Sequence, residues 1–368
     1  MNNAHGKTIL ILGNSRLVVF GFRGELIQAL VKQGYNVVVS FPNGPFGQGE
    51  EESKKYGCKF VETKIDRRGK NPLKDLLLLK KYISLIREYS PYAVLAFTVK
   101  CDIYGGIACR INDTTFIPNI TGLGKALAEG GFVATITKFL YTIAVRKAKC
   151  VFFQNESDKK YFDDNIKYRS GIVLPGSGVN LNKFKVLPYP QDNKIVFTYI
   201  ARVMKAKGIE EFITAAKYFK QHSKKIEFHV CGYCEEDYKG IMKQLDDDGI
   251  IKYHGMVKDV IPYEKQSNCI VLPSFHPEGI SNVLLEAAAS GRPIITTDHP
   301  GCRETVTDKK TGFLVKPHDS QDLIKVMEIF VGLTKKEQEI MGVAGRKKME
   351  KEFDREIVVN AYLRSLEN

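Results

Sequence analysis

No segment of this sequence is apolar over a long stretch, and none approaches the roughly 18 uncharged apolar residues that are needed to cross a bilayer. The N-terminal stretch MNNAHGKTILILG contains a short apolar run, but it lacks a charged leader and a small-residue cleavage site. We therefore expect this run to form a β-strand. We also expect the protein to be cytoplasmic, because its scattered cysteines fit a reduced setting.

Paired cysteines and closely spaced metal ligands are also scarce. The eight cysteines are scattered singly, apart from Cys231 and Cys234, and none of the seven histidines belongs to a cluster with metal-ligand spacing. A disulfide framework is not expected at this length, and a zinc site would need a second ligand pair. The Cys-Gly-Tyr-Cys spacing resembles a redox motif, but two small residues at the end of a strand are the favoured interpretation.

The 368 residues are enough for two domains, and the composition is ordinary for a globular protein. Apolar segments alternate with amphipathic ones, which is typical of a parallel sheet covered on both faces by helices. The elements expected in the first half are the strands and helices Thr8–Leu12, Glu25–Gln33 (a helix ended by Gly34), Val37–Ser40, Leu73–Glu88 (a helix), Ala93–Phe97, Thr115–Pro118, Cys150–Phe153 and Ile172–Leu174.

The pattern restarts after the segment Val186–Asp192, which we interpret as a linker because it contains two prolines. The elements expected after it are Ile195–Ile200, Gly208–Lys220 (a helix), Ile226–Val230, Ile251–His254, Asn268–Pro273 and Pro293–Thr296. We therefore expect an α/β fold with two doubly wound, Rossmann-like domains, 1–188 and 189–353, and a C-terminal helix within 354–368 that can pack back on the first. Two such domains facing a central cleft would place a ligand wall on each side.

The net charge of +13 lies in the first half of the chain. Residues 1–188 hold 28 Lys and Arg against 15 Asp and Glu, whereas residues 189–368 hold 27 of each. Nucleic acid, an anionic membrane surface or a phosphorylated acceptor could each explain this excess, as could a merely soluble basic surface. The candidate membrane patch is Lys64–Lys70 with Lys80 and Lys81, and the favoured interpretation of the adjacent Leu76–Leu79 is core.

Two cations follow the first strand of the second half. Arg202 and Lys207 flank a strand-to-helix turn, which is a common place for bound phosphate. Together they could hold a diphosphate and neutralise a leaving nucleoside diphosphate. The alternative is that both are solvated loop residues.

Two carboxylates, Glu278 and Glu286, lie eight residues apart. Ser281 or Asn282 can cap the helix that carries Glu286, and the start of that helix offers backbone N–H groups to a phosphate. Glu286 can accept hydrogen bonds from a ribose diol. The alternative is a helix whose acidic first turn favours the macrodipole, and Gly279 weakens that alternative because a glycine before a helix suggests close backbone approach.

With the segment Thr311-Gly312-Phe313-Leu314-Val315, these motifs resemble the retaining glycosyltransferases of the GT-B fold, family four, over nearly the whole chain. The resemblance implies that Glu278 lies beside the transferred sugar and Glu286 holds the ribose, while Arg202 and Lys207 hold the diphosphate. It further assigns donor contacts to Met256, Val257, Gly279, Ile280, Ser281, Asn282, Val283, Gly122 and Gly124. Glu278, Arg202 and Lys207 are the implied catalytic residues.

The first half resembles the acceptor domain of that family more loosely. The resemblance implies acceptor contacts for Asn14 and Arg16 in the loop after the first strand, for Arg23, and for Lys100. The segment Phe97–Gly106 looks like one found in bacterial enzymes that build capsule, O-antigen or N-glycan precursors on polyprenyl diphosphate. Many relatives carry a histidine in this region, and Lys100 is the nearest polar candidate in its place.

The resemblance implies a nucleotide-sugar substrate, no cofactor and no metal. Asp246-Asp247-Asp248 could be taken for an Asp-x-Asp metal motif, but a solvated acidic helix end is the favoured interpretation. The implied reaction moves a hexose or N-acetylhexosamine from a UDP-sugar, N-acetylgalactosamine being one guess, to a glycan or polyprenyl-diphosphate-linked acceptor, with an anionic membrane surface as a candidate partner and no nucleic acid.

Three other functions are considered. A GT-B relative that epimerises sugar nucleotides or performs phosphorolysis would share the fold, and a non-catalytic sugar-nucleotide-binding protein would share the donor site. A nicotinamide-dependent dehydrogenase is disfavoured because the first strand ends in Gly-Asn-Ser-Arg, not in the dinucleotide fingerprint.

Overall fold

The computed structural model describes residues 5–43, 49–67, 69, 71–124, 127, 130–223 and 225–367. The chain divides into two compact units. The first consists of Met1–Ser177, Pro277–Gly279 and Arg355–Asn368, and the second of Gly178–His276 and Ile280–Asp354. Each unit has its own parallel sheet and its own apolar core.

The sheet of the first unit has the strand order β3-β2-β1-β4-β5-β6-β7. Its strands are β1 (Thr8–Leu12), β2 (Asn36–Phe41), β3 (Lys59–Glu62), β4 (Ala93–Phe97), β5 (Thr115–Ile120), β6 (Val151–Phe153) and β7 (Gly171–Val173). The continuously apolar strands β1 and β4 are buried, as expected for strands between two helix layers. The chain order reverses between β1 and β4, and open α/β sheets bind ligands beside such a reversal, at the carboxyl ends of the strands.

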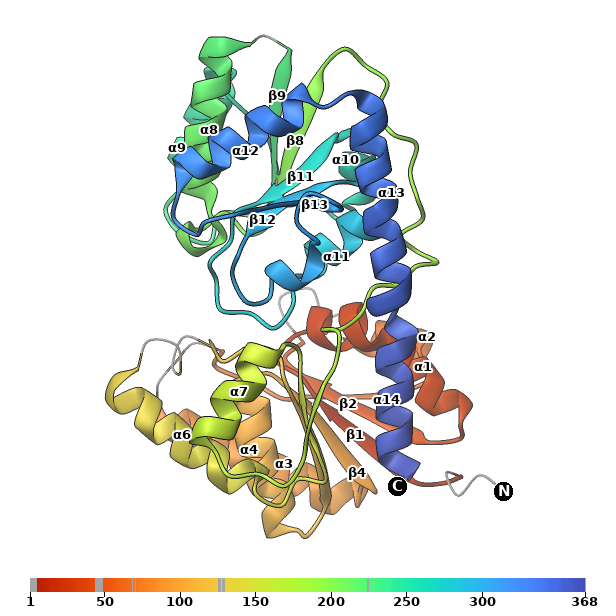
Figure 1. The fold of residues 1–368 in the computed structure, drawn as a ribbon. Helices are drawn as coiled ribbons and strands as arrows, with labels where there is room; N and C mark the ends of the chain where they lie inside the picture. The colour runs from red at the N-terminus through yellow and green to blue at the C-terminus, as the bar shows by residue number, and fades with distance from the viewer. Residues whose placement is uncertain are drawn as a thin grey trace. The chain divides into compact units, whose positions relative to one another are not determined.

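Helices cover both faces of this sheet. One layer contains α3 (Pro72–Tyr89), α4 (Val99–Ile111) and α6 (Gly131–Val145), and the opposite layer contains α1 (Phe22–Lys32) and α14 (Arg355–Glu367) (Figure 1). The shorter helices of this unit are η1 (Leu17–Gly21), α2 (Gly49–Lys55) and α7 (Glu156–Asn165).

The sheet of the second unit has the strand order β10-β9-β8-β11-β12-β13, and its order reverses between β8 and β11. The strands are β8 (Ile195–Ile200), β9 (Ile226–Cys231), β10 (Lys252–Gly255), β11 (Cys269–Leu272), β12 (Ile294–Thr297) and β13 (Gly312–Val315). The helices are η2 (Lys205–Lys207), α8 (Ile209–His222), α9 (Lys239–Asp247), α10 (Ile261–Gln266), α11 (Asn282–Ala289), η3 (Arg303–Thr305), α12 (Ser320–Gly332) and α13 (Lys335–Glu352).

The segment that the sequence marks as a linker packs firmly on the second unit. The Tyr189 hydroxyl is buried and donates to the backbone oxygen of Asn268 at 2.9 Å. The Arg292 guanidinium donates to the backbone oxygen of Pro188 at 2.6 Å. Upstream of it, the Val179 N–H donates to the backbone oxygen of Phe353 at 2.8 Å, and the second unit begins at Gly178.

Several features of the first unit were not predicted or were predicted differently. The helix expected from Glu25 begins at Phe22, after the π-helical turn η1, and α4 and α6 were not predicted as helices. Leu78 is buried, as expected, but Leu76 and Leu77 are 48% and 64% exposed, so the core interpretation is wrong for these two. A helix buries only one face, and a run of four leucines covers more than one face.

Candidate active site

Three loops meet at the carboxyl edge of the second sheet. The Ala201 N–H donates to the backbone oxygen of Cys231 at 3.1 Å, and the Gly232 N–H donates to that of Gly255 at 2.7 Å. A side chain at Gly232 would overlap the Ala201 oxygen, so only glycine fits where the loops after β8 and β9 touch. Met256, 77% exposed, and the half-buried Val257 follow Gly255 directly, so both predicted donor contacts lie on the loop after β10, which touches the loop after β9.

Arg202 and Lys207 occupy the loop after β8, as the sequence predicts, but in different surroundings. Arg202 is partly exposed and forms an ion pair with Glu235, whose side chain is 10% exposed. Lys207 is buried at the end of η2 and is followed by Gly208, which has a left-handed φ of 76°. A Cβ at Gly208 would lie 2.1 Å from the backbone oxygen of Pro273, so the turn into α8 requires glycine.

The loops after β8 and β11 touch at the reversal of strand order. The Phe275 N–H donates to the backbone oxygen of Ala206 at 3.0 Å. This bond ties the turn that carries Lys207 to the segment that leads to Glu278. Both loops therefore lie where a doubly wound sheet binds its ligand.

The helix α11 begins without a side-chain cap. Ser281 occupies the N-cap position, but its side chain makes no capping hydrogen bond, contrary to the cap that the sequence suggests. The Asn282 Oδ1 atom is buried and has no hydrogen-bond partner. Glu286 is half-buried and stands beyond the first turn of α11, so the acidic-first-turn alternative does not describe it. An uncapped helix start offers N–H groups to an anion.

Glu304, for which no role was predicted, holds the α11 start in place through Gly301. The Ser281 N–H donates to the backbone oxygen of Gly301 at 2.8 Å, and the Gly301 N–H donates to the Glu304 carboxylate at 2.8 Å. Burial raises the pKa of Glu304. The sequence signal was the short spacing of Gly301 and Glu304, which allows a carboxylate to reach back to a loop N–H.

Glu278 and Gly279 belong to the first unit although Glu286 belongs to the second. The Gly279 N–H donates to the backbone oxygen of Thr121 at 3.0 Å. The Asn155 amide donates to the backbone oxygen of Gly279 at 2.8 Å. A Cβ at Gly122, which has a φ of 126°, would lie 3.0 Å from the Glu278 Cα. The structure thus brings Glu278 beside the predicted glycine loop.

Close packing explains the glycines here. A Cβ at Gly279 would lie 2.2 Å from the Gln154 side-chain oxygen and 2.7 Å from its Cβ. A Cβ at Gly124, which has a φ of 71°, would lie 3.2 Å from Val99 at the start of α4. Gln154 and Asn155, which directly follow β6, were not predicted as site residues, because nothing in the sequence links them to the distant Gly279.

Of the predicted acceptor residues, Asn14 and Lys100 follow the two strands at the reversal in the first sheet. Asn14 is half-buried, and its Oδ1 atom is buried without a hydrogen-bond partner. The Lys100 ammonium donates to Asp75 at 2.5 Å and to the backbone oxygen of Gly69 at 2.8 Å. Thr98, just before α4, has a φ of 86°, which is rare for a β-branched residue and common at functional sites.

Arg16 and Arg23 have other partners. The exposed Arg16 pairs with Glu52 at 2.9 Å, so its guanidinium is held against α2. Arg23 is buried above the Phe97 ring, and its Nη2 atom has no hydrogen-bond partner. Burial lowers the pKa of Arg23 to about 10, so it stays charged at neutral pH.

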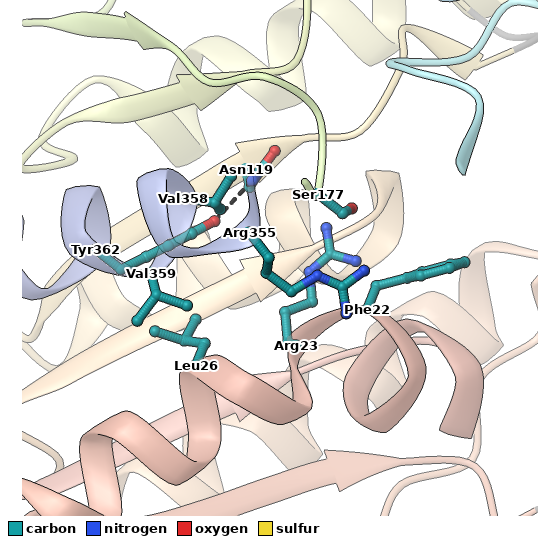
Figure 2. A pocket seen from close by; sticks show the side chains of 9 residues that line it. All are labelled: Phe22, Arg23, Leu26, Asn119, Ser177, Arg355, Val358, Val359 and Tyr362. Carbon is teal, nitrogen blue, oxygen red and sulfur yellow. Dashed lines mark hydrogen bonds between the residues drawn. The ribbon is translucent and has the colours of Figure 1, made fainter. Parts of the chain in front are cut away.

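Arg23 lines a small pocket of the first unit. Figure 2 shows the guanidinium groups of Arg23 and Arg355 side by side, with the Ser177 hydroxyl nearby. Arg355 pairs with Glu25 at 2.8 Å. Burial raises the pKa of the neighbouring Asp102, against the opposing influence of the Arg23 guanidinium. The unpartnered Nη2 atom of Arg23 gives this small pocket a cationic hydrogen-bond donor.

The remaining polar motifs have simple structural roles. Asp246, Asp247 and Asp248 are exposed at the end of α9, and Asp246 accepts a hydrogen bond from the Tyr253 N–H at 3.1 Å. Cys231 and Cys234 are free thiols, and burial raises the pKa of Cys231 to about 12. A protonated, buried thiol is not a nucleophile, so the redox interpretation is not supported.

Known proteins resemble this chain in sequence over both units. The family model "Glycosyl transferases group 1" matches residues 182–348, and "Glycosyl transferase 4-like" matches residues 8–155. A Campylobacter jejuni protein, N,N'-diacetylbacillosaminyl-diphospho-undecaprenol alpha-1,3-N-acetylgalactosaminyltransferase, is 24% identical over 96% of this chain and 96% of its own length. The Staphylococcus aureus capsular polysaccharide biosynthesis glycosyltransferase CapM is 27% identical over 91% of this chain and 90% of its own.

Solved structures share the fold. A Rickettsia africae glycosyltransferase has a TM-score of 0.79 at 19% identity, covering 99% of this chain and 98% of its own. Anabaena HepE, solved with UDP and glucose, has a TM-score of 0.79 at 18% identity, covering 98% of this chain and 99% of its own. With two family models that together span most of the sequence, the chain belongs to the GT-B glycosyltransferases of the family-four type, and it is a transferase enzyme.

Proposed function

We propose that this enzyme is a retaining glycosyltransferase that moves a hexose or N-acetylhexosamine from a UDP-sugar to a glycan or polyprenyl-diphosphate-linked acceptor. We place this reaction in the synthesis of bacterial surface polysaccharides or glycans. The Campylobacter relative, named for an undecaprenyl-diphosphate-linked substrate, and CapM support this assignment, because both match nearly the full chain.

One observation carries the donor assignment: the phosphate-binding features converge at the reversal of the second sheet. The loop after β8 supplies Arg202 and Lys207, and a hydrogen bond joins it to the loop after β11. The uncapped start of α11 supplies backbone N–H groups. Two cations and a helix start are a suitable set for a diphosphate.

These residues favour departure of a nucleoside diphosphate. As the bond from the sugar to the diphosphate breaks, negative charge grows on the leaving oxygen, and the cations of Arg202 and Lys207 stabilise it there. The anomeric carbon gains positive charge at the same time. A Glu278 carboxylate beside the sugar would favour that charge and orient the hydroxyls, while Glu286 would hold the ribose. Because two cations serve the diphosphate, we propose that no metal is required.

The first unit supplies the acceptor contacts in this proposal. Asn14 and Lys100 lie beside the reversal of the first sheet, and the strained Thr98 stands next to them. Arg23 has a buried guanidinium with an unpartnered nitrogen, so it is our candidate contact for the charged part of the acceptor. Arg16 would have to leave Glu52 to take part.

We propose that the enzyme works at the inner face of the cytoplasmic membrane as a peripheral protein. Among the helices that the structure describes, none combines the length and the apolar character needed to span a bilayer. A lipid-linked acceptor would nevertheless require contact with the membrane surface.

The decisive test is release of UDP and formation of a glycosylated lipid from purified protein. UDP-sugars are offered singly with short polyprenyl diphosphate-linked sugars, and the anomeric configuration of the product is read by nuclear magnetic resonance. UDP should also raise the melting temperature in EDTA. Transfer with inversion would contradict the retaining assignment, and loss of UDP stabilisation in EDTA would contradict the metal-free site. Binding without turnover across all acceptors would favour a non-catalytic protein, and interconversion of UDP-sugars would favour an epimerase.

A further inference from the structure

The helix α6 exposes a row of large apolar side chains. Phe132 and Phe139 are 79% and 65% exposed, and Ile136 between them is 43% exposed. These positions are spaced by four and three residues, so they share one face of the helix. The opposite face, with Ala134, Tyr141 and Val145, is buried in the unit. Two phenylalanines exposed to this degree on one helix face mark a contact surface.

The helix α3 adds a second row in the same layer. Leu73 and Leu77 are 70% and 64% exposed, and both lie near the start of the helix. α4 contacts both α3 and α6, so it lies between them (Figure 1). Helices that join neighbouring parallel strands run opposite to the strands, so the starts of all three helices lie at the carboxyl edge of the sheet. That edge also carries Asn14 and Lys100.

The charged residues of α6 and of the segment directly after it are all basic. From Gly130 to Cys150 the sequence contains no Asp or Glu, and it contains Lys138, Arg146, Lys147 and Lys149. Arg146 and Lys147 are exposed directly after the helix. On α3, Lys74 and Lys80 are exposed beside the leucines. Exposed aromatic side chains bordered by cations are complementary to a membrane interface with anionic headgroups.

We propose that the outer face of α6, with the N-terminal half of α3, docks on an anionic lipid bilayer. Phe132, Ile136 and Phe139 enter the headgroup region, and the neighbouring cations contact lipid phosphates. Docking in this way brings the acceptor edge of the first sheet to the membrane surface. The choice of a bilayer over a protein partner rests on the proposed lipid-linked acceptor.

This face differs from the basic patch that the sequence suggests. Arg68 and Lys70 of that patch lie outside the described residues. Lys74 pairs with Asp66 at 2.9 Å, which neutralises part of its charge. The aromatic row on α6 therefore carries more of the proposed contact than the segment Lys64–Lys70.

Flotation of the full chain tests the proposal. The vesicles contain either phosphatidylglycerol with phosphatidylethanolamine or phosphatidylcholine alone, in about 0.1 M and about 0.5 M salt. The first variant is Phe132→Ser with Phe139→Ser, and its control is Ile329→Ser with Ile340→Ser, two exposed residues of the second unit. The second variant is Arg146→Gln with Lys147→Gln, and its control is Lys347→Gln with Lys351→Gln on α13.

We expect the wild type and both controls to float with the anionic vesicles, less so at high salt. The partition coefficient of the phenylalanine variant into the anionic vesicles should be at least about tenfold lower than that of the wild type. The Arg146 and Lys147 variant should partition on the order of tenfold less in low salt and should lose its salt dependence. All variants should keep the wild-type melting temperature and its increase with UDP, because the changed residues are exposed.

The proposal would be overturned if the phenylalanine variant floated as well as the wild type. It would also be overturned if the wild-type protein bound neither kind of vesicle. A reproducible dimer by light scattering that the phenylalanine variant abolishes, without vesicle binding, would assign the face to a second copy of the chain and overturn it as well. Transfer to a water-soluble short-chain acceptor is measured in parallel. Vesicle binding without any transfer would contradict the proposed function and support the docking face. Transfer without vesicle binding would support the proposed function and overturn the docking face.

Discussion

Arg202, the proposed diphosphate ligand, is paired with the carboxylate of Glu235. A diphosphate that binds Arg202 must share it with this carboxylate or displace it, and the two anions repel each other. Glu235→Gln keeps a hydrogen-bonding group and removes the charge, so we expect UDP to bind about two- to tenfold more tightly. Isothermal titration measures this, with Glu236→Gln as the matched control on the same loop. Weaker UDP binding in Glu235→Gln would mean instead that the carboxylate holds Arg202 in its productive position.

Substitutions of Glu278 and Glu286 should have different effects on the kinetics. Glu278→Gln keeps the shape and removes the charge beside the sugar, so it should lower kcat with little change in donor affinity. Glu286→Gln should mainly raise the KM for the donor, by about ten- to a hundredfold, because the ribose contact is the same before and during reaction. Steady-state kinetics and melting temperatures of both variants decide this. Full activity in a folded Glu278→Gln enzyme would remove the central assignment of the site.

Gly279→Ala tests the close packing beside Glu278. The added methyl group would meet both the oxygen and the Cβ of Gln154, so the backbone that carries Glu278 must move. We expect turnover to fall by at least about tenfold, because displacements of an ångström or less are costly at a reacting centre. Gly240→Ala is the control, since a Cβ at Gly240 in α9 meets nothing within 4 Å. Equal activity of the two variants would show that the segment at Gly279 does not position Glu278.

Arg23→Met should separate stability from acceptor recognition. The buried guanidinium has an unpaired nitrogen, and burying a charge is costly, so replacing it with an apolar chain should leave the melting temperature unchanged or raise it. The kcat/KM for a phosphate-containing acceptor should fall by about tenfold or more, with UDP affinity unchanged. Arg23→Lys, which keeps the charge but not the planar fork, should recover only part of the activity. A large drop in melting temperature with unchanged kinetics would assign Arg23 to the fold alone.

Glu264 predicts a pH dependence of stability. Burial raises its pKa to about 7, against the opposing influence of the Ser290 hydroxyl and Arg292, while Asp259 raises it slightly and Lys183 lowers it. Because the pKa of this acid is higher in the folded state, the folded state holds more protons, and its contribution to stability falls as pH rises from about 4.5 to about 7.

Glu264→Gln removes that dependence and can still accept the Ser290 hydrogen bond. We expect the variant to gain stability relative to the wild type from pH 5 to pH 8, by up to roughly 3 kcal/mol. Urea unfolding across this range measures the gain, with the exposed Glu350→Gln as the control. If the difference in the free energy of unfolding between the variant and the wild type stayed constant from pH 5 to pH 8, the pKa of Glu264 would not change on folding.

The sequence by itself determined the parallel α/β architecture and most strands, because buried parallel strands are continuous apolar runs that no other element explains as well. It also supplied the proposed donor motifs, since Arg202, Lys207, Glu286 and the α11 start are local features within a few residues of one strand or helix. The helix α6 escaped prediction because its sequence is apolar on more than one side, so periodicity did not separate a buried face from an exposed one.

Contacts between distant segments decided the rest. Only the folded chain shows that Glu278 packs against Gly122 while Glu286 lies on α11. It also shows that Arg202 forms an ion pair with Glu235, and that Lys100 forms one with Asp75. Only packing determines that Phe132 and Phe139 stay exposed whereas Tyr141 on the same helix is buried. Local propensity specifies which secondary structure a segment can form. Burial against segments far away in the sequence decides which of its side chains stay exposed and can contact a ligand or another surface.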